Sequence, residues 1–187
     1  MLTSGVAAAR VVTISAPLMA AVGASVGGSQ METGRPWLPR PWYALTPRCD
    51  LDPAKSYLCV LTWSRVPLRL FPSFAAQADR VFEELYRLHG DRLVGCSGAY
   101  SPRLSSWAAP VAETVTVWHT WEAMSEFYGG PVHLEAMRNF SRESLPTLTI
   151  RRVWLSAADV PEHGDFFEAG RLYERIRAGE FPAAVRE

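Results

Sequence analysis

Segments with strand-like and helix-like patterns alternate between residues 57 and 155, and their order restricts the fold more than any other feature of the sequence. Four segments rich in β-branched and aromatic residues predict strands. A helical spacing of apolar residues fills the interval after the first strand and the interval before the last one. The resulting order, βαββαβ, predicts an α+β fold of the ferredoxin-like kind, although another α+β sandwich has the same order. The predicted strands are residues 57–65, 93–100, 113–120 and 147–155.

The predicted helices have recognisable start and stop signals. The first opens at Pro72 and is expected to stop at Gly90. The second interval holds a short helix over residues 121–128, and Pro131 begins another helical piece after the Gly129-Gly130 break. A last helix is predicted beyond the strands, capped by Asp165 with Glu168 three positions on, and it is expected to pack on the domain or on a partner subunit.

The ends of the chain differ from its middle. Residues 1–30 contain one charged residue, Arg10, and are expected to be a secretory leader, an organellar transit peptide or an over-extended start. Their apolar stretch is too short and too diluted to predict a membrane span. Residues 31–55 are rich in proline and predict an irregular lead-in. The predicted α+β domain is therefore residues 56–156, and residues 157–187 form a helical tail.

Composition excludes several classes of protein. The formal net charge is zero, so no overall field would attract nucleic acid or an anionic membrane. The three cysteines show no C-x-x-C spacing, which argues against a disulfide framework and a cysteine zinc site. Free thiols fit a reducing compartment. We therefore expect a cytoplasmic protein, or an organellar or secreted one if residues 1–30 are a processed leader.

The clearest strand, residues 113–120, bears on assembly. Side chains alternate between the faces of a strand, so Trp118 and His119 are expected on opposite faces. The predicted helices between the strands cover one face of the sheet. An apolar second face would need a cover. The sequence therefore predicts a homodimer that packs sheet against sheet.

His133 is the candidate for chemistry, because it shares the predicted buried helix face with Met137 and Phe140. It would either donate to a carbonyl of the Gly-Gly-Pro turn or serve as an acid–base group, since an ordinary histidine pKa suits proton transfer near neutral pH. Arg151 and Arg152 lie on opposite faces of the last strand. One of them is expected to reach a pocket and hold an anion or a carbonyl, or else to form a surface or interface ion pair.

The segment from Thr116 to Met137 resembles the antibiotic-biosynthesis-monooxygenase-like superfamily of dimeric α+β barrels, and in particular an uncharacterised branch of it. The resemblance lies in Trp118, a methionine six positions later, an aromatic residue nine later and a histidine fifteen later, here Met124, Phe127 and His133. Phe74, Gln77 and Gly95 are similar more loosely. The resemblance as a whole covers about residues 57–155.

The resemblance implies a monooxygenase-like oxidoreductase that acts on a small apolar molecule, aromatic or polyene, in a cavity between sheet and helices. His133 would be its catalytic residue, and Trp63, Trp118, Tyr128 and Arg151 would bind the substrate. The superfamily includes a branch of quinone-forming monooxygenases, and resemblance to that branch implies no cofactor. Haem-degrading members carry Trp and a haem-ligating His where this chain has Phe127 and Met137. A carotenoid-oxidising branch has a helix His near the place of His133.

Two functions therefore stay open from the sequence. One is the monooxygenase-like enzyme, without a cofactor. The other is a non-catalytic dimeric α+β barrel that binds a small ligand or haem. Phosphate-binding glycine loops, the serine-hydrolase elbow and the H-E-x-x-H zinc motif are absent from the sequence, and we predict no metal site.

Overall fold

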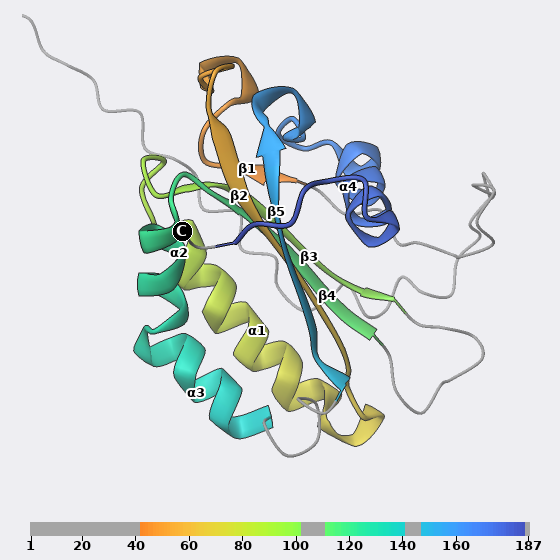
Figure 1. Cartoon of the computed structure of the whole chain (residues 1–187). Helices are drawn as coiled ribbons and strands as arrows, with labels where there is room; N and C mark the ends of the chain where they lie inside the picture. Colours follow the sequence, from red (N-terminus) through yellow and green to blue (C-terminus); the bar gives the residue numbers. More distant parts are fainter. Residues whose placement is uncertain (1–41, 102–110, 141–146, 186–187) are drawn as a thin grey trace, which may run out of the picture. The chain divides into compact units, whose positions relative to one another are not determined.

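A five-stranded antiparallel sheet forms the centre of the structure (Figure 1). The computed structural model describes residues 42–101, 111–140 and 147–185, so the predicted leader lies outside the described residues. Within them the strands follow the order β1-β3-β4-β2-β5 across the sheet. Their bounds are β1 Tyr43–Ala44, β2 Ser56–Arg65, β3 Leu93–Ser101, β4 Val111–Trp118 and β5 Thr149–Ser156.

Four α-helices accompany the sheet in the described part of the chain, which confirms the α+β class. They are α1 Phe71–Tyr86, α2 Trp121–Tyr128, α3 Pro131–Phe140 and α4 Phe166–Ala178. The Thr120 hydroxyl caps α2 by accepting a hydrogen bond from the Ala123 N–H, at 3.1 Å. None of the helices in the described residues is both long enough and apolar enough to cross a membrane.

Two glycines carry roles that the sequence pattern identified only in part. Gly90 was predicted to stop α1, but the helix ends at Tyr86. A Cβ at Gly90 would lie 3.2 Å from the Leu45 carbonyl oxygen, so this glycine instead allows the backbone of the lead-in to lie close to residue 90. The second glycine, Gly95, stands where the pairing of β3 with β4 shifts register, between Leu93 and Gly95, which marks a bulge or an irregularity in the ladder.

One face of the sheet packs against α1, α2 and α3. Leu58 and Val60 of β2 and Trp118 of β4 are fully buried there. Met124 and Phe127, which stand three residues apart on α2, supply the opposing helix surface. The predicted alternation of β4 is confirmed, because Trp118 joins this cluster while Val115 and Val117 join the cluster on the other face.

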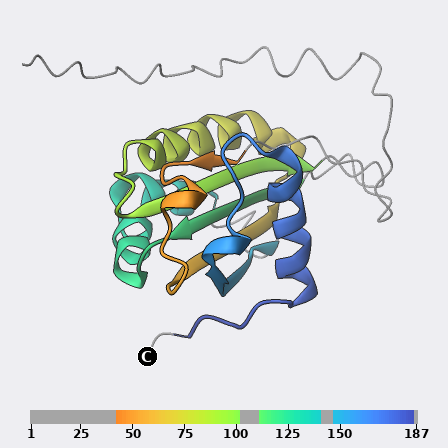
Figure 2. The ribbon, with the colours of Figure 1, turned by 90° about the horizontal axis from the view of Figure 1, so that it is seen from above.

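The other face of the sheet is covered by α4 and the lead-in of the same chain. Leu172, Tyr173 and Ile176 of α4 are buried against β-strand residues such as Cys59 and Val153. In Figure 2, α4 stands apart from the other three helices. The last helix was expected to pack either on the domain or on a partner subunit, and it packs on the domain. The second face of the sheet therefore needs no partner subunit to cover it, and that premise of the predicted homodimer is wrong. The homodimer itself stays a prediction.

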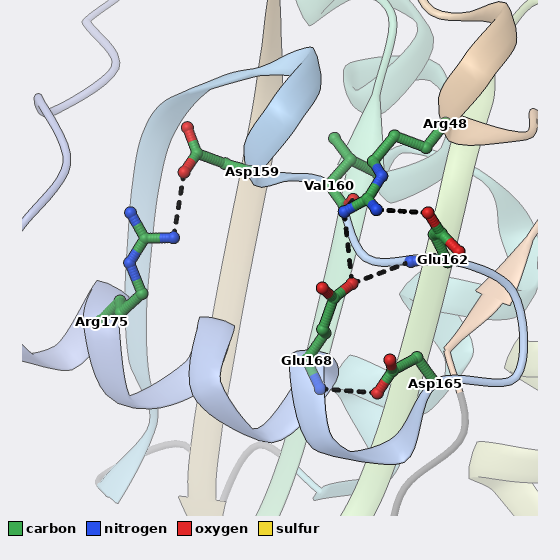
Figure 3. A network of polar contacts seen from close by, with 7 residues as sticks. All are labelled: Arg48, Asp159, Val160, Glu162, Asp165, Glu168 and Arg175. Carbon is green, nitrogen blue, oxygen red and sulfur yellow. Dashed lines mark hydrogen bonds and ion pairs between the residues drawn. The ribbon is translucent and has the colours of Figure 1, made fainter.

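A network of polar contacts fixes the start of α4 to the lead-in (Figure 3). Asp165 caps the helix as predicted, accepting from the Glu168 N–H at 2.8 Å. The Glu168 carboxylate accepts from the Glu162 N–H at 3.3 Å and from Arg48 at 3.3 Å. Arg48 also pairs with the Glu162 carboxylate and donates to the Val160 carbonyl at 3.5 Å. Segments about 110 residues apart in the sequence are thereby held together.

Candidate functional site

Two cavities lie at the same end of the sheet, one on each face. At this end β2 stops at Arg65 and β4 starts at Val111, and the two residues are register partners. Because side chains alternate along a strand, successive residues are divided between the faces. Thr62 and Ser64 contribute to the cavity beneath α1 and α3, whereas Arg65 contributes to the cavity beside α4.

The helix-side cavity lies between the sheet and helices α1 and α3, and its volume is about 140 Å³. Its walls are mainly apolar. Phe74 of α1 and Phe140 of α3 meet edge to face there, with ring centroids 5.1 Å apart. The full lining is Thr62, Trp63, Ser64, Phe74, Ala112, Thr114, Ala136, Met137, Phe140 and Leu148.

Three hydroxyl groups and the indole of Trp63 are the polar side-chain groups of this cavity's sheet wall. Thr62 and Thr114 face each other across the β2–β4 pair and share a hydrogen bond. Ser64 is buried two residues further along β2. None of the described residues that line the cavity carries a carboxyl, imidazole or amino group. The site can therefore orient a ligand through hydroxyl groups, but it offers no side chain that titrates near neutral pH.

The α4-side cavity is larger, about 290 Å³, and it is strongly charged. The Glu113 carboxylate of β4 is almost fully buried and pairs with Arg177 of α4. Arg177 also approaches Glu174, at 3.5 Å. The lining is Trp63, Arg65, Val111, Glu113, Thr147, Arg151 and Arg177.

His133 lies outside the lining of both cavities. Its Nδ1 is 3.1 Å from the Tyr128 carbonyl oxygen, and because a carbonyl only accepts, Nδ1 donates the proton. Burial lowers the pKa of His133 below its ordinary value, and the hydrogen bond to Tyr128 opposes that shift in part. The imidazole thus closes the turn before α3, which is one of the two roles that its position in the sequence allowed.

Tyr128 lies beside His133, Trp118 packs on Tyr128, and both contribute to the helix-side core. The Trp118 Nε1–H donates to the Thr116 hydroxyl at 2.8 Å, so its polar atom is already satisfied. The Tyr128 ring packs edge to face on His133, with centroids 4.5 Å apart. Burial raises the pKa of Tyr128 to about 12, so its phenol stays protonated at neutral pH.

Trp63 and Arg151 form the second group of predicted site residues, at the other end of β2. Arg151 lines the α4-side cavity, with its guanidinium carbon 5.8 Å from the Trp63 ring centroid. Arg152 points to the opposite face, where it lies 5.9 Å from the centre of the Trp121 ring. The five predicted residues are therefore divided into two groups and do not surround one cavity.

Several lining residues of the helix-side cavity escaped sequence reasoning. Thr62 and Thr114 are polar residues within apolar strands, and Ala136 is a small residue next to Met137 on α3. The signal for Thr62 and Thr114 was their strand parity, which places both on the face opposite Glu113. For Ala136 the signal was a small side chain on a helix face that otherwise carries large ones.

No protein-family model matches the sequence, and no curated protein matches it. Among solved structures, the chain is similar in part to a conserved protein from Methanosarcina mazei Go1, known from a crystal structure. The TM-score is 0.39 and the sequence identity is 12%, over 51% of this chain and 90% of that chain. At this degree of similarity, function has to be inferred from the residues of the chain itself.

Proposed function

We propose that the protein binds a small apolar molecule in the helix-side cavity and performs no acid–base chemistry on it. The observation that carries this proposal is the lining: aromatic and aliphatic side chains from β2, α1, β4 and α3, with three hydroxyl groups and the Trp63 indole as its polar groups. Small-molecule sites commonly combine apolar walls with a few oriented polar groups. The Thr62–Thr114 pair would accept one hydrogen bond from a ligand or donate one to it.

The volume of the cavity limits the size of the ligand. A dry protein cavity of about 150 Å³ accepts benzene, and the helix-side cavity has about 140 Å³. The ligand is therefore of the size of a single six-membered ring. Met137, an unbranched and adaptable side chain, lies in the lining and can repack around molecules of somewhat different shape.

The position of His133 favours binding over the oxidoreductase function that the sequence resemblance implies. An acid–base group has to come within hydrogen-bond reach of its substrate. His133 instead donates to the Tyr128 carbonyl and does not line the cavity. Haem does not fit the residues present either. A porphyrin is far larger than a benzene-sized cavity, and no histidine lines the cavity among the described residues.

We also propose that the domain is of the ferredoxin-like kind. The strand order β3-β4-β2-β5, with the helical connections packed on one face, supports this. Membership in the antibiotic-biosynthesis-monooxygenase-like superfamily is a proposal that rests on the sequence resemblance. A dimer formed through the sheet is not included, because α4 of the same chain occupies the face that such a dimer would use.

Thermal unfolding in benzene-saturated buffer tests the binding proposal on the full chain. A ligand that binds only the folded state raises the unfolding midpoint, and the increase grows with the ratio of free ligand concentration to the dissociation constant. We expect benzene to raise the midpoint of the wild-type protein. Ala136→Leu should fill the cavity and abolish that increase. Asn139→Leu is the matched control, since it adds the same side chain at an exposed position of the same helix.

The comparison of the two variants is decisive. Retention of the benzene effect in Asn139→Leu, together with its loss in Ala136→Leu, supports the helix-side cavity as the site. If benzene leaves the wild-type midpoint unchanged, or if Ala136→Leu responds as strongly as the wild type, the proposal is wrong.

A further inference from the structure

We propose that the α4-side cavity is a second binding site, and that it takes a small organic acid with a planar body. The carboxylate would lie against Arg65 and Arg151, and the body would lie against Trp63 and Val111. This inference does not rest on the proposed function, because the ligands differ in charge and the two cavities share only Trp63 among the described residues that line them.

The strand register brings the basic and aromatic groups together. Arg65 follows Trp63 by two positions on β2, so both side chains are on the α4 face. Trp63 pairs with Glu113 on β4, and Leu61, two positions before Trp63 on β2, pairs with Arg151 on β5. Trp63 therefore lies between two arginines, Arg65 on its own strand and Arg151 on the neighbouring strand β5. The Arg177 guanidinium of α4 lies 5.6 Å from the Trp63 ring centroid.

The guanidinium groups differ in how fully they are already engaged. Arg177 pairs with the carboxylates of Glu113 and Glu174. Arg151 uses Nη1 alone, which donates to the carbonyls of Ile176 and Arg177 at 2.8 and 2.7 Å.

The other nitrogens of Arg151 and the whole Arg65 guanidinium have no acceptor among the described residues. The lining thus holds three arginines against one glutamate. Guanidinium groups bind carboxylates through paired, charge-assisted hydrogen bonds.

The size and lining of the cavity point to an organic acid and not to an inorganic ion. About 290 Å³ is roughly twice the 150 Å³ that suffices for benzene. The indole of Trp63 and the Val111 side chain give the cavity an apolar wall beside the charged groups. A planar ring can pack on such a wall while its carboxylate reaches the arginines.

A purely structural role for these arginines is the competing explanation. Arg151 caps the carboxyl end of α4, and Arg177 joins α4 to the sheet, so both are needed for the fold. Arg65 has neither task. Its side chain is exposed, and only its backbone bonds to Thr147. Arg65 is therefore the residue that separates the two explanations.

Isothermal titration calorimetry on the full chain tests the site with three probes. Benzoate should bind, whereas benzyl alcohol, which has a similar shape but no charge, should bind at least tenfold more weakly. Inorganic phosphate should not compete with benzoate. Arg65→Gln should weaken benzoate binding about tenfold or more, because a charge-assisted hydrogen bond is lost. Arg87→Gln, which removes an exposed arginine just after α1, should leave the affinity unchanged.

Two further measurements keep this site apart from the helix-side cavity. Ala136→Leu should leave benzoate binding intact, and Arg65→Gln should leave the effect of benzene on thermal unfolding intact. The inference is overturned if benzoate gives no binding heat, if benzyl alcohol binds equally well, if phosphate displaces benzoate, or if Arg65→Gln binds benzoate as the wild type does.

Discussion

The Glu113 carboxylate on β4 pairs with the Arg177 guanidinium on α4, and this ion pair joins the sheet to the helix that covers its second face. Only 3% of the Glu113 side chain is exposed, compared with 16% for Arg177. A buried carboxylate is costly without a partner. The packing of α4 on the sheet therefore depends on the charge of the Glu113 carboxylate.

Removing one partner of this pair should destabilise the fold more than removing both. Arg177→Met leaves the Glu113 charge buried, and we expect it to lower the free energy of unfolding by about 3 kcal/mol or more. Arg177→Met combined with Glu113→Leu should recover most of that loss. Urea-induced unfolding followed by circular dichroism measures both. Equal losses in the single and the double variant would show that the ion pair is not the cause.

The hydrogen bond of His133 to a turn predicts a pH dependence of stability. Because the pKa of His133 is lower in the folded protein than its ordinary value of 6.5, the folded state binds protons less readily than the unfolded chain. This contribution to stability is fully present above pH 6.5 and is lost as the pH falls towards the folded-state pKa. His133→Gln should therefore flatten the decrease in the free energy of unfolding below pH 6.5.

A direct measurement of the His133 pKa accompanies that experiment. The imidazole ¹H chemical shifts of the folded protein should titrate with a midpoint below 6.5. At pH 8, where the imidazole is neutral in both states, the difference between His133→Gln and wild type should no longer depend on pH. A midpoint at or above 6.5 would contradict the burial of this side chain.

Two glycines should respond to alanine in opposite directions. A Cβ at Gly95 would lie 2.6 Å from the buried Trp42 ring, so Gly95→Ala should cost about 1–3 kcal/mol. Gly170 lies inside α4, and a Cβ there meets no atom within 4 Å. Gly170→Ala should stabilise the helix by about 0.5–1 kcal/mol. Thermal unfolding measures both changes. A Gly95→Ala variant as stable as the wild type would refute the packing of Trp42 on β3, and a destabilised Gly170→Ala variant would refute the open space beside Gly170.

Local patterns were sufficient to predict most of the elements of the fold. The strands and helices between residues 57 and 155 follow from periodicity, and the cap of α4 at Asp165 follows from residue type and spacing. The position of α4 did not follow. Its apolar stripe is equally suited to a partner subunit or to its own sheet, and only tertiary contacts such as that of Leu172 decide between them.

The site was harder to predict than the fold, for a physical reason. Sequence reasoning selected large and titratable residues such as Trp118 and His133, but these satisfy their polar atoms within the core. The lining of the helix-side cavity depends instead on where small side chains such as Ala136 leave space. The size of a cavity is set by the packing of several elements, and no single segment of the sequence encodes it.

The central claim is that the helix-side cavity receives an apolar ligand, and the methyl groups of two methionines test it most directly. Met137 lines the cavity, whereas Met124 is buried in the same face without lining it. In a benzene titration of ¹³C-methyl-methionine protein, we predict a saturable chemical-shift change of the Met137 methyl group and a nuclear Overhauser effect from benzene to that methyl group. The chemical shift of the Met124 methyl group should not change. No change at Met137, or an equal change at Met124, would contradict the claim.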